Sequence, residues 1–398
     1  MSVLHSKKIL LAVSAGIAAY KAAFLVRGLI KAGADVKVIM TPDAQNFVTP
    51  LTLSTLSKHP VEWEFFGDKG DWNNHVEYAL WADYMIVAPC TANTLSHMAD
   101  GTCDNLVLAT YLSAKCPVFF APAMDLDMYQ HPTTKQNIDQ LVQNGNILIP
   151  AESGELASGL VGEGRMAEPE NIIRFIENHI AATLPLYGKK LVVSAGPTYE
   201  NIDPVRFIGN YSSGKMGFEI AKEASRMGAQ VILVSGPSHE SVQGFPIQRI
   251  NVVSAREMYD AMHANFNDAD VVVMSAAVAD YRPKEMATQK IKKNDEDMTI
   301  ELVKNPDILK SLGELKAQQL LVGFALETNN EEEFAKQKLA KKNLDFIVLN
   351  SMQDKEAGFQ KNTNKITIIN KDGSLQSFDA KSKTDVAKDI LNVVITKL

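Results

Sequence analysis

The first forty residues alternate between strand-like segments and an amphipathic stretch. Residues 9–13 form an uninterrupted apolar run, residues 17–32 carry apolar side chains at helical spacing up to Gly33, and residues 35–40 form a second strand-like segment. Continuous apolar runs are typical of strands buried on both faces, and the helical spacing predicts a helix between them. The chain therefore begins with a predicted strand-helix-strand unit.

The same order of elements starts again near the middle of the chain. The repeated strand, turn, helix and strand are expected at residues 191–193, 194–196, 216–227 and 231–234. Each start needs its own new strand and a right-handed crossover, so two tandem domains explain the repetition better than one long sheet. We place the boundary within residues 184–188, which gives domains of residues 1–186 and 187–398.

Each half continues with strands separated by helices. In the first half we expect strands at residues 84–88 and 118–121 and a helix at residues 132–144. In the second half we expect strands at residues 271–275, 320–325 and 346–349 and a helix at residues 331–342. This alternation implies parallel sheets with helices on both faces, and such sheets place ligands at the carboxyl ends of their strands. The predicted fold class is α/β, with two tandem three-layer Rossmann-like domains.

The composition narrows the class of protein further. Of 398 residues, 46% are hydrophobic and 22% are charged, which is typical of a globular protein and excludes a disordered one. The net charge of -7 disfavours binding to nucleic acid or to an anionic membrane. No apolar run approaches the roughly 20 residues of a membrane helix, and the three cysteines lack metal-binding or redox spacing. We therefore expect a soluble cytoplasmic protein.

Two turns contain the residue types of phosphate-binding loops. The first, Ser14 to Ile17, has one glycine, Gly16, where a dinucleotide fingerprint needs three, so a mononucleotide phosphate fits better than NAD. A plain strand-to-helix turn explains this segment equally well. The second, Gly209 to Met216, fits G-x-x-x-x-G-K but ends in Met and does not follow its strand directly. We therefore exclude a P-loop, and its amides remain compatible with an anion nest.

One histidine has the placement of a general acid or base. His75 follows a polar, turn-like stretch at residues 68–74 and precedes apolar residues that lead into Trp81. An imidazole with a pKa of about 6.5 exchanges protons at neutral pH, although a lone histidine more often has a structural role. On the residues alone both interpretations stay open.

Eight segments in one order resemble a single family over nearly the whole chain. They are IAAYK, APCTAN, APAM, GEGRM, AGPT, NYSSGKMG, AAVADYR and KIKK, at residues 17–21, 88–93, 121–124, 162–166, 195–198, 210–217, 276–282 and 290–293. Together they make the chain similar to the bifunctional phosphopantothenoylcysteine decarboxylase and phosphopantothenate-cysteine ligase of bacterial coenzyme A biosynthesis.

The resemblance implies a flavodoxin-like N-terminal flavoprotein domain that binds FMN. The matching positions are Ser14, Gly16, Ile17 and Thr41 on the phosphate side, and Thr91, Ala92 and Asn93 around the flavin. In the family, FMN oxidises the cysteine moiety of the substrate, the thioaldehyde lets the carboxylate leave as carbon dioxide, and the reduced flavin returns the electrons. His75 matches the family's catalytic acid or base.

Two residues depart from the family's pattern in this domain. Asp125 stands where the family has asparagine, and Ser158 stands where it has a proton-donating cysteine. An ionised carboxylate donates no hydrogen bond to a substrate carboxylate, and a hydroxyl is a weaker acid than a thiol. We expect decarboxylation to persist with Asp125 neutral and with Ser158, a water or another group relaying the final proton.

For the second half the resemblance implies a CTP-dependent ligase. In the family, CTP with Mg²⁺ activates the carboxylate of 4'-phosphopantothenate as an acyl-cytidylate, and the amine of cysteine displaces CMP. Lys290 matches the active-site lysine of a mobile polar loop, and Asn210 matches a residue that holds the acyl-cytidylate. The positions that match the CTP site are Asp280, Lys290, Pro306, Asp307, Ile308, Leu309, Phe324, Lys338 and Lys342.

The resemblance also implies a homo-oligomer, because the family's flavin domains form trimers and its ligase domains form dimers, which together give a dodecamer. Within the enzymes, the main alternative is a ligase whose decarboxylase domain is impaired by Asp125 and Ser158. A flavin-binding regulatory subunit is a second alternative, but it would not need Lys290 or Asn210. A nicotinamide oxidoreductase fails on the number of glycines.

Overall fold

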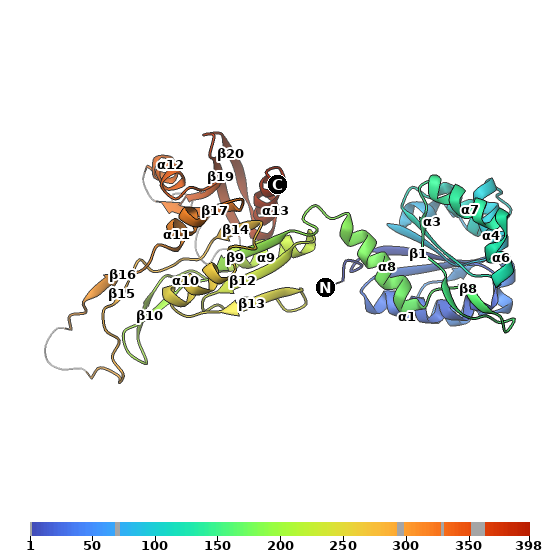
Figure 1. The fold of residues 1–398 in the computed structure, drawn as a ribbon, viewed down its shortest axis with the longest axis horizontal. Coiled ribbons are helices and arrows are strands. Elements are labelled where there is room, and N and C mark those ends of the chain that lie inside the picture. The colour runs from blue at the N-terminus through green and yellow to red at the C-terminus, as the bar shows by residue number, and fades with distance from the viewer. Residues whose placement is uncertain (1, 68–71, 293–297, 328–329, 352–362) are drawn as a thin grey trace. The chain divides into compact units, whose positions relative to one another are not determined.

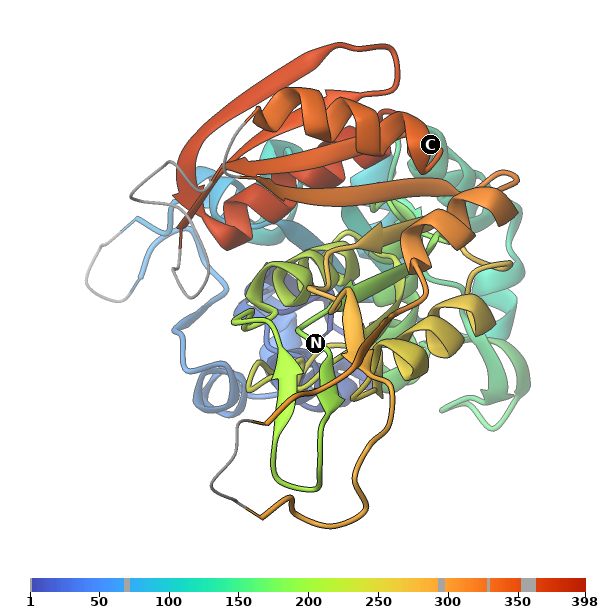
Figure 2. The same ribbon diagram turned by 90° about the vertical axis from the view of Figure 1, so that its left-hand side faces the viewer.

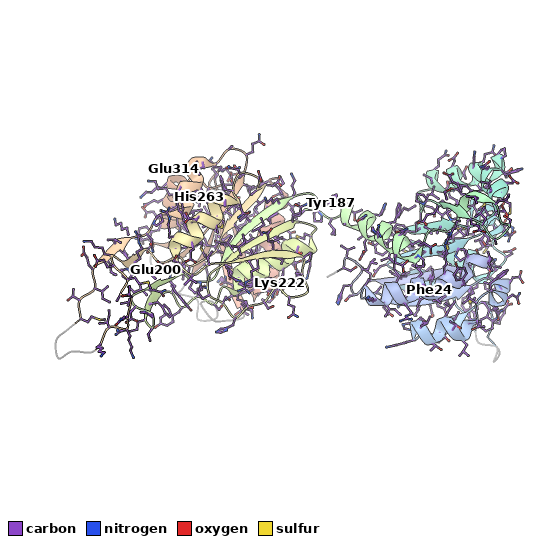
Figure 3. The ribbon with its side chains drawn as sticks, turned by 60° about the horizontal axis from the view of Figure 1, so that its bottom comes forward. Phe24, Tyr187, Glu200, Lys222, His263 and Glu314 are labelled. Carbon is purple, nitrogen blue, oxygen red and sulfur yellow. The ribbon has the colours of Figure 1, made fainter. Side chains whose placement is uncertain are left out.

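The computed structural model describes residues 2–67, 72–292, 298–327, 330–351 and 363–398. The chain divides into two compact units, Met1–Ala181 and Ala182–Leu398 (Figure 1). The predicted boundary, after residue 186, lies shortly after this division. Tyr187, the first residue of the predicted second domain, is labelled in Figure 3. Each unit has a central sheet between two helical layers, which confirms the predicted class of two tandem three-layer Rossmann-like domains.

The first unit contains a parallel sheet with the strand order β3-β2-β1-β4-β5-β6. Its strands are β1 (Lys8–Val13), β2 (Asp35–Met40), β3 (Val61–Glu62), β4 (Tyr84–Cys90), β5 (Val118–Pro122) and β6 (Ile147–Leu148). The core of β1 is apolar because Ile9, Leu11 and Val13 pack against one helical layer while Leu10 and Ala12 pack against the other. The chain changes direction across the sheet between β1 and β4, and ligands bind at such a reversal.

Helices cover both faces of this sheet (Figure 1). One layer contains the 3-10 turn η1 (Ile17–Lys21), α1 (Ala22–Lys31), α2 (Pro50–Ser57) and α8 (Pro169–Ala182). The other layer contains α3 (His75–Trp81), α4 (Ala92–Asp100), α5 (Leu106–Ser113) and α7 (Pro132–Gln143). The single helix expected at residues 17–32 is thus a 3-10 turn followed by a shorter α-helix.

The second unit contains a mixed sheet with the order β13-β12-β9-β14-β17-β18-β19-β20. Its strands are β9 (Lys190–Ala195), β12 (Gln230–Ser235), β13 (Ile247–Asn251), β14 (Val271–Met274), β17 (Leu320–Glu327), β18 (Phe346–Ser351), β19 (Thr363–Asn370) and β20 (Leu375–Ser382). The strands from β13 to β18 are parallel, as expected, and β19 and β20, which were not predicted, run antiparallel to their neighbours. The unpredicted hairpin of β19 and β20 has its turn at Asp372-Gly373, where Gly373 adopts a φ of 85°. An Asp-Gly pair between strands is a sequence signal for a hairpin turn.

Among the described residues, five helices cover this second sheet. Two of them, α9 (Lys215–Arg226) and α13 (Lys383–Ile395), pack on one face, and α10 (Ala255–Ala264), α11 (Ile308–Leu315) and α12 (Glu331–Lys341) pack on the other. β9 is buried on both faces in the same way as β1, because Leu191 and Val193 face one layer and Val192 faces the other. Among the described residues, no helix has the length and apolarity that crossing a membrane requires.

Two short hairpins, which we name the arm, project from this sheet and lie side by side (Figures 1 and 2). They pair β10 (Tyr199–Asn201) with β11 (Phe207–Gly209) and β15 (Tyr281–Pro283) with β16 (Leu302–Lys304). The N-H of Ala287 donates to the carbonyl of Ile202 at 3.0 Å, so the two hairpins are joined by a backbone hydrogen bond. The sequence analysis did not predict the arm.

Replacing Phe218 by alanine should destabilise the second unit selectively. Phe218 is fully buried on α9, and truncating such an aromatic side chain costs about 3–5 kcal/mol of unfolding free energy. Calorimetry should show a lower transition temperature for the second unit and an unchanged one for the first. Leu375→Ala, at an exposed position of β20, is the control and should change stability by about 0.5 kcal/mol or less.

Candidate active sites

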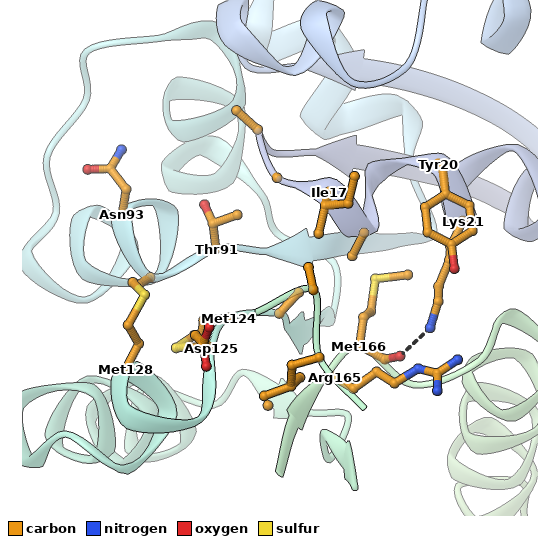
Figure 4. Close-up of a pocket in the computed structure, with 18 of the residues that line it drawn as sticks. Ile17, Tyr20, Lys21, Thr91, Asn93, Met124, Asp125, Met128, Arg165 and Met166 are labelled. Atoms are coloured by element: carbon orange, nitrogen blue, oxygen red, sulfur yellow. Dashed lines mark hydrogen bonds between the residues drawn. The ribbon is translucent and has the colours of Figure 1, made fainter. Parts of the chain in front are cut away.

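The first unit has a cavity of about 730 Å³ beyond the carboxyl ends of β1 and β4 (Figure 4). Its walls are η1, the start of α4, the segment that leads into α6 (Leu126–Gln130), and the hairpin of β7 (Glu152–Glu155) and β8 (Val161–Arg165). Figure 4 shows Ile17, Thr91 and Asp125 on three different sides of this space. The cavity lies at the sheet edge where the parallel fold places ligands.

Most of the positions expected around FMN line this cavity. They are Gly16, Ile17, Thr91, Ala92 and Asn93. Ser14 lies behind the wall: it is fully buried, its hydroxyl donates to the carbonyl of Pro89 at 2.7 Å, and its Oγ accepts from the N-H of Thr91 at 3.0 Å. Ser14 therefore fixes the turn after β1 to the end of β4. The Oγ1 of Thr41 is buried and has no hydrogen-bond partner among the described residues.

The β7-β8 hairpin is held against the opposite wall of the cavity. The N-H of Met124 donates to the carbonyl of Gly164 at 3.0 Å. Gly164 has a φ of 137°, and a Cβ at this position would lie 2.5 Å from the carbonyl oxygen of Met124, so no other residue fits without a shift. The Nζ of Lys21 donates to the carbonyl of Met166 at 2.8 Å, as Figure 4 shows, and to Glu168 at 3.1 Å. These contacts tie η1, the hairpin and the segment before α6 together.

Several residues of this wall were not among the predicted site residues. They include Tyr20, Lys21, Met128, Glu155 and Arg165. Lys21 belongs to the IAAYK motif and is buried within an apolar helical stretch, and a lysine in such a stretch is the signal that could have identified it.

The two residues that depart from the family's pattern lie in different places. Asp125 lines the cavity and caps α6, because its Oδ1 accepts from the N-H of Leu126 at 2.6 Å. Ser158 is exposed at the turn of the β7-β8 hairpin and is not among the cavity's lining residues, and its Oγ accepts from the N-H of Leu160 at 3.4 Å. The cavity wall reaches only as far as Ala157 in this segment.

His75 does not reach this cavity within one chain. It is the first residue of α3, its ring makes edge contacts with Phe65 and Trp72, and its buried Nδ1 has no hydrogen-bond partner in the described parts of the chain. Its neighbours include large apolar side chains that face solvent: Phe66 is 68% exposed and Trp72 is 56% exposed. Residues 68–71 of the polar stretch before it lie outside the described residues.

The second unit has a cavity of about 440 Å³ that brings together most of the positions expected for CTP. Its lining residues include Asp280, Pro306, Asp307, Ile308, Leu309, Phe324, Lys338 and Lys342. Lys338 and Lys342 lie four residues apart, so one face of the α12 segment carries both ammonium groups to the same cavity.

The charged groups of this cavity are already partly paired. The Nζ of Lys342 lies 3.0 Å from the carboxylate of Asp307, and the Nζ of Lys338 donates to the carbonyl of Phe324 at 2.7 Å. Burial alone would raise the pKa of Asp307, but hydrogen bonds from the N-H of Lys310 and from Lys342, with the nearby lysine charges, lower it below its usual value. Asp307 therefore stays ionised and holds Lys342 in place.

Lys290 and Asn210 lie outside this cavity, on or beside the arm. Lys290 is exposed, and the next residue is fixed: the N-H of Ile291 donates to Asp203 at 3.2 Å, and Arg206 donates to the carbonyl of Ile291 at 2.8 Å. The hydrogen bonds from Arg206 hold the pKa of Asp203 well below its usual range. The Nδ2 of Asn210 donates to the carbonyl of Ala277 at 3.0 Å.

The loop that follows Lys290 is described only in part, because residues 293–297 lie outside the described residues, Lys293 of the KIKK motif among them. No group of three or more His, Cys, Asp or Glu side chains in the described ranges is placed to hold a metal ion.

Two family models match the two halves of the chain. Residues 2–181 match the family model named Flavoprotein, and residues 186–398 match the model named DNA/pantothenate metabolism flavoprotein C-terminal domain.

Similar proteins cover nearly the whole chain. The coenzyme A biosynthesis bifunctional protein CoaBC of Bacillus subtilis is 47% identical and covers 98% of this chain and 97% of its own length. A cysteine/cysteine sulfinic acid decarboxylase of an unknown prokaryotic organism is 50% identical over 88% of this chain and 99% of its own. The crystal structure of the C-terminal domain of a CoaBC protein is 42% identical, covers 54% of this chain and 98% of its own, and has a TM-score of 0.47.

The family models and the near full-length similarity agree with the eight motifs found in the sequence. The chain therefore belongs to the bifunctional coenzyme A biosynthesis family, and it is an enzyme that joins a phosphopantothenoylcysteine decarboxylase flavoprotein domain to a phosphopantothenate-cysteine ligase domain.

Proposed function

We propose that the first unit binds FMN in its 730 Å³ cavity and that the second unit binds CTP with Mg²⁺ in its 440 Å³ cavity. The observation that carries this proposal is that two separate sets of motif residues, each scattered along its half of the sequence, line one cavity each. The substrates are 4'-phosphopantothenate and cysteine, and the product of ligation is then decarboxylated to 4'-phosphopantetheine.

The first cavity fits a flavin mononucleotide. Its volume lies within the range of about 300–1,000 Å³ that is usual for small-molecule sites. The turn at Gly16 and Ile17 opens toward it at the start of η1, where backbone N-H groups bind phosphate well. Thr41 is not among the residues that line this cavity, although its buried Oγ1 has no hydrogen-bond partner in the described parts of the chain. When bound, FMN would take two electrons from the thiol of the cysteine moiety and return them after carbon dioxide has left.

The residues of the chain hold and protonate the substrate in this scheme. Asp125 lies on the wall where the substrate carboxylate would bind, and a neutral Asp125 would donate a hydrogen bond to it, whereas an ionised one would repel it. Ser158, a water or another group relays the final proton to the sulfur-bearing product. Ser158, at the position of the family's cysteine, lies on the turn between β7, which ends at Glu155, and β8, which begins at Val161.

We further propose that the first site is completed by a second copy of the chain. His75, the matched acid or base, lies outside the cavity of its own chain, beside Phe66, Trp72, Val76 and Leu80, whose side chains are 40–68% exposed. Contiguous exposed apolar side chains of this kind are typical of protein-protein contacts. Trimers of the first unit and dimers of the second would together give a dodecamer.

In the ligase, Lys338 and Lys342 face the phosphates of CTP, and Mg²⁺ binds mainly through phosphate oxygens and water. An oxygen of the 4'-phosphopantothenate carboxylate bonds to the α-phosphorus, and the bond to the β-phosphate breaks, which releases pyrophosphate. The amine of cysteine then attacks the acyl carbon, loses a proton, and displaces CMP. Lys290 and Asn210 stabilise the acyl-cytidylate from the arm.

One comparison favours a second candidate activity for the first unit. The relative that is 50% identical is named for decarboxylation of cysteine and cysteine sulfinic acid. Free cysteine carries the same thiol and carboxylate as the cysteine moiety of phosphopantothenoylcysteine. The first unit would then decarboxylate free cysteine as well as, or in place of, the larger substrate.

Replacing Lys290 by glutamine should reduce ligation at least a hundredfold and leave decarboxylation unchanged. The change removes the cation proposed to stabilise the acyl-cytidylate but keeps a polar side chain on an exposed loop. CMP release measures the first activity, and carbon dioxide release from added phosphopantothenoylcysteine measures the second. Lys284→Gln, an exposed lysine of the same arm, is the control. Loss of both activities in the Lys290 variant would refute independent sites.

The wild-type enzyme should form 4'-phosphopantetheine, and Ser158→Cys should accelerate its formation, because a thiol is a stronger acid than a hydroxyl. Mass spectrometry separates this product from the oxidised, decarboxylated thiol-ene. Ser153→Cys, on the same hairpin, controls for the added thiol. Accumulation of the thiol-ene by the wild type would defeat the proposed relay, and faster turnover of free cysteine than of phosphopantothenoylcysteine would favour the second candidate.

Two inactive variants should restore decarboxylation to each other when mixed. His75→Asn keeps an intact cavity, while Gly16→Val blocks the cavity, because a Cβ at Gly16 already meets Thr91 at 3.0 Å. Random assortment into trimers should recover about a quarter of the sites. The measurement is carbon dioxide release after the variants are unfolded and refolded together. Mixed oligomers without activity, or an active wild-type monomer in light scattering, would contradict a shared site.

A further inference from the structure

A second cavity of about 310 Å³ adjoins the proposed CTP cavity in the ligase unit. The two share five lining residues, Ala276, Val278, Asp280, Phe324 and Lys338, so they are continuous. The remaining walls of the adjoining cavity come from the start of α9, the ends of β14, β17 and β18, and the first residues of β19 and α13. Neither the motifs nor the matched positions give a role to the β19 and α13 side of this cavity.

Lys383 of α13 lines this cavity in an unfavourable environment. It is only 7% exposed, and its ammonium makes no hydrogen bond or ion pair with any residue that the structure describes. It is also the first residue of α13, and the positive end of the helix dipole disfavours a cation there. Burial lowers the pKa of Lys383, the charge of Lys215 lowers it further, and Glu240 opposes the shift. Folding alone therefore gives no reason to keep a lysine at this position.

The neighbouring wall has other unsatisfied polar atoms. The side-chain oxygens of Asn350 and Asn364 are buried and have no partner in the described ranges, and Asn364 is only 3% exposed. Both residues line the cavity, and each amide also carries two donors. A buried cation beside amides whose oxygens have no partner among the described residues is a feature of a site that a ligand completes.

The balance of charge in the two cavities indicates that the ligand of the adjoining cavity is an anion. Lys215, Lys338 and Lys383 line the adjoining cavity with Asp280 as its one acidic residue. The CTP cavity is lined by Lys304, Lys338 and Lys342 with two acidic residues, Asp280 and Asp307. The adjoining cavity is therefore the more cationic of the two. Gly214, with a φ of 81°, begins α9 beside it, so the positive end of that helix dipole adds to the same field.

We propose that Lys383 binds the β- and γ-phosphates of the nucleotide and then the pyrophosphate that leaves. This proposal rests on the proposed use of CTP by the ligase. When the carboxylate oxygen bonds to the α-phosphorus, the bond from that phosphorus to the bridging oxygen breaks, and the electron pair and its negative charge stay on pyrophosphate. Lys383 and Lys215 neutralise that charge.

The test is Lys383→Met, which keeps the length of the side chain and removes the charge. The probes are inorganic pyrophosphate, measured by calorimetric titration of the full-length enzyme, and CTP, measured through CMP formation. We expect pyrophosphate binding and kcat/KM for CTP to fall at least tenfold, and the Tm of the nucleotide-free enzyme to stay the same or rise. Lys388→Met is the control: this exposed lysine of the same helix pairs with Asp385, and its loss should change neither quantity.

A structural role for Lys383 predicts the opposite signs, namely a lower Tm and unchanged affinity for pyrophosphate, and that result would overturn the proposal. Asn364→Asp is a second variant, which adds a negative charge to the same wall and should also weaken pyrophosphate binding. Unchanged binding in this variant would overturn the proposal as well. A wild-type enzyme that forms no CMP from CTP would instead refute the proposed function.

Discussion

Burial of the central strands on both faces is the constraint from which the rest of this structure follows. In β1 the side chains of Ile9 and Leu11 face one helical layer and that of Leu10 faces the other, so no position within the strand is free for chemistry. The first polar side chain comes directly after the strand, at Ser14, and it is used to join β1 to β4. In the second unit the corresponding polar residue is Ser194, the next-to-last residue of β9, whose Oγ accepts from the N-H of Ala276 just after β14 at 3.2 Å. Both cavities consequently form beyond the strand ends.

The elements that obey this constraint are the ones that the sequence predicts well. The apolar runs of β1, β4, β9 and β14 and the helical spacing of α9 can each be recognised from the local sequence, because each element carries its own burial pattern. The arm and the β19-β20 hairpin do not, since their strands are short or half exposed and depend on partners distant in sequence. The positions proposed for CTP were identified through motifs, whereas the burial of Lys383 depends on β19 and α13 meeting α9, a tertiary relation that no local pattern encodes.

Two residues that the motifs identify as catalytic do not line either cavity, and both are placed in the same way. His75 begins α3 beside exposed aromatic side chains, and Lys290 lies on an arm that also exposes Val205 and Tyr211. Each is carried by an element that packs incompletely within its own unit. A side chain that must reach a ligand from outside the cavity needs a second copy or a moving segment to bring it there. In the function proposed above, the rigid sheet edge would bind the cofactor or nucleotide, and the peripheral elements would supply the proton or the charge.

Two buried lysines show how a structural cation can be told from a binding one. Lys21 is 3% exposed, but its ammonium donates to the carbonyl of Met166 and pairs with Glu168, so its burial is compensated within the fold. Lys383 is 7% exposed and has no such partner in the described parts of the chain. Leaving a buried charge unpaired costs stability, and a fold keeps such a group only where another requirement outweighs that cost. The cavity beside Lys383 adjoins the one lined by Lys338 and Asp280, so the polyanion of CTP, bound as proposed above, would supply that requirement.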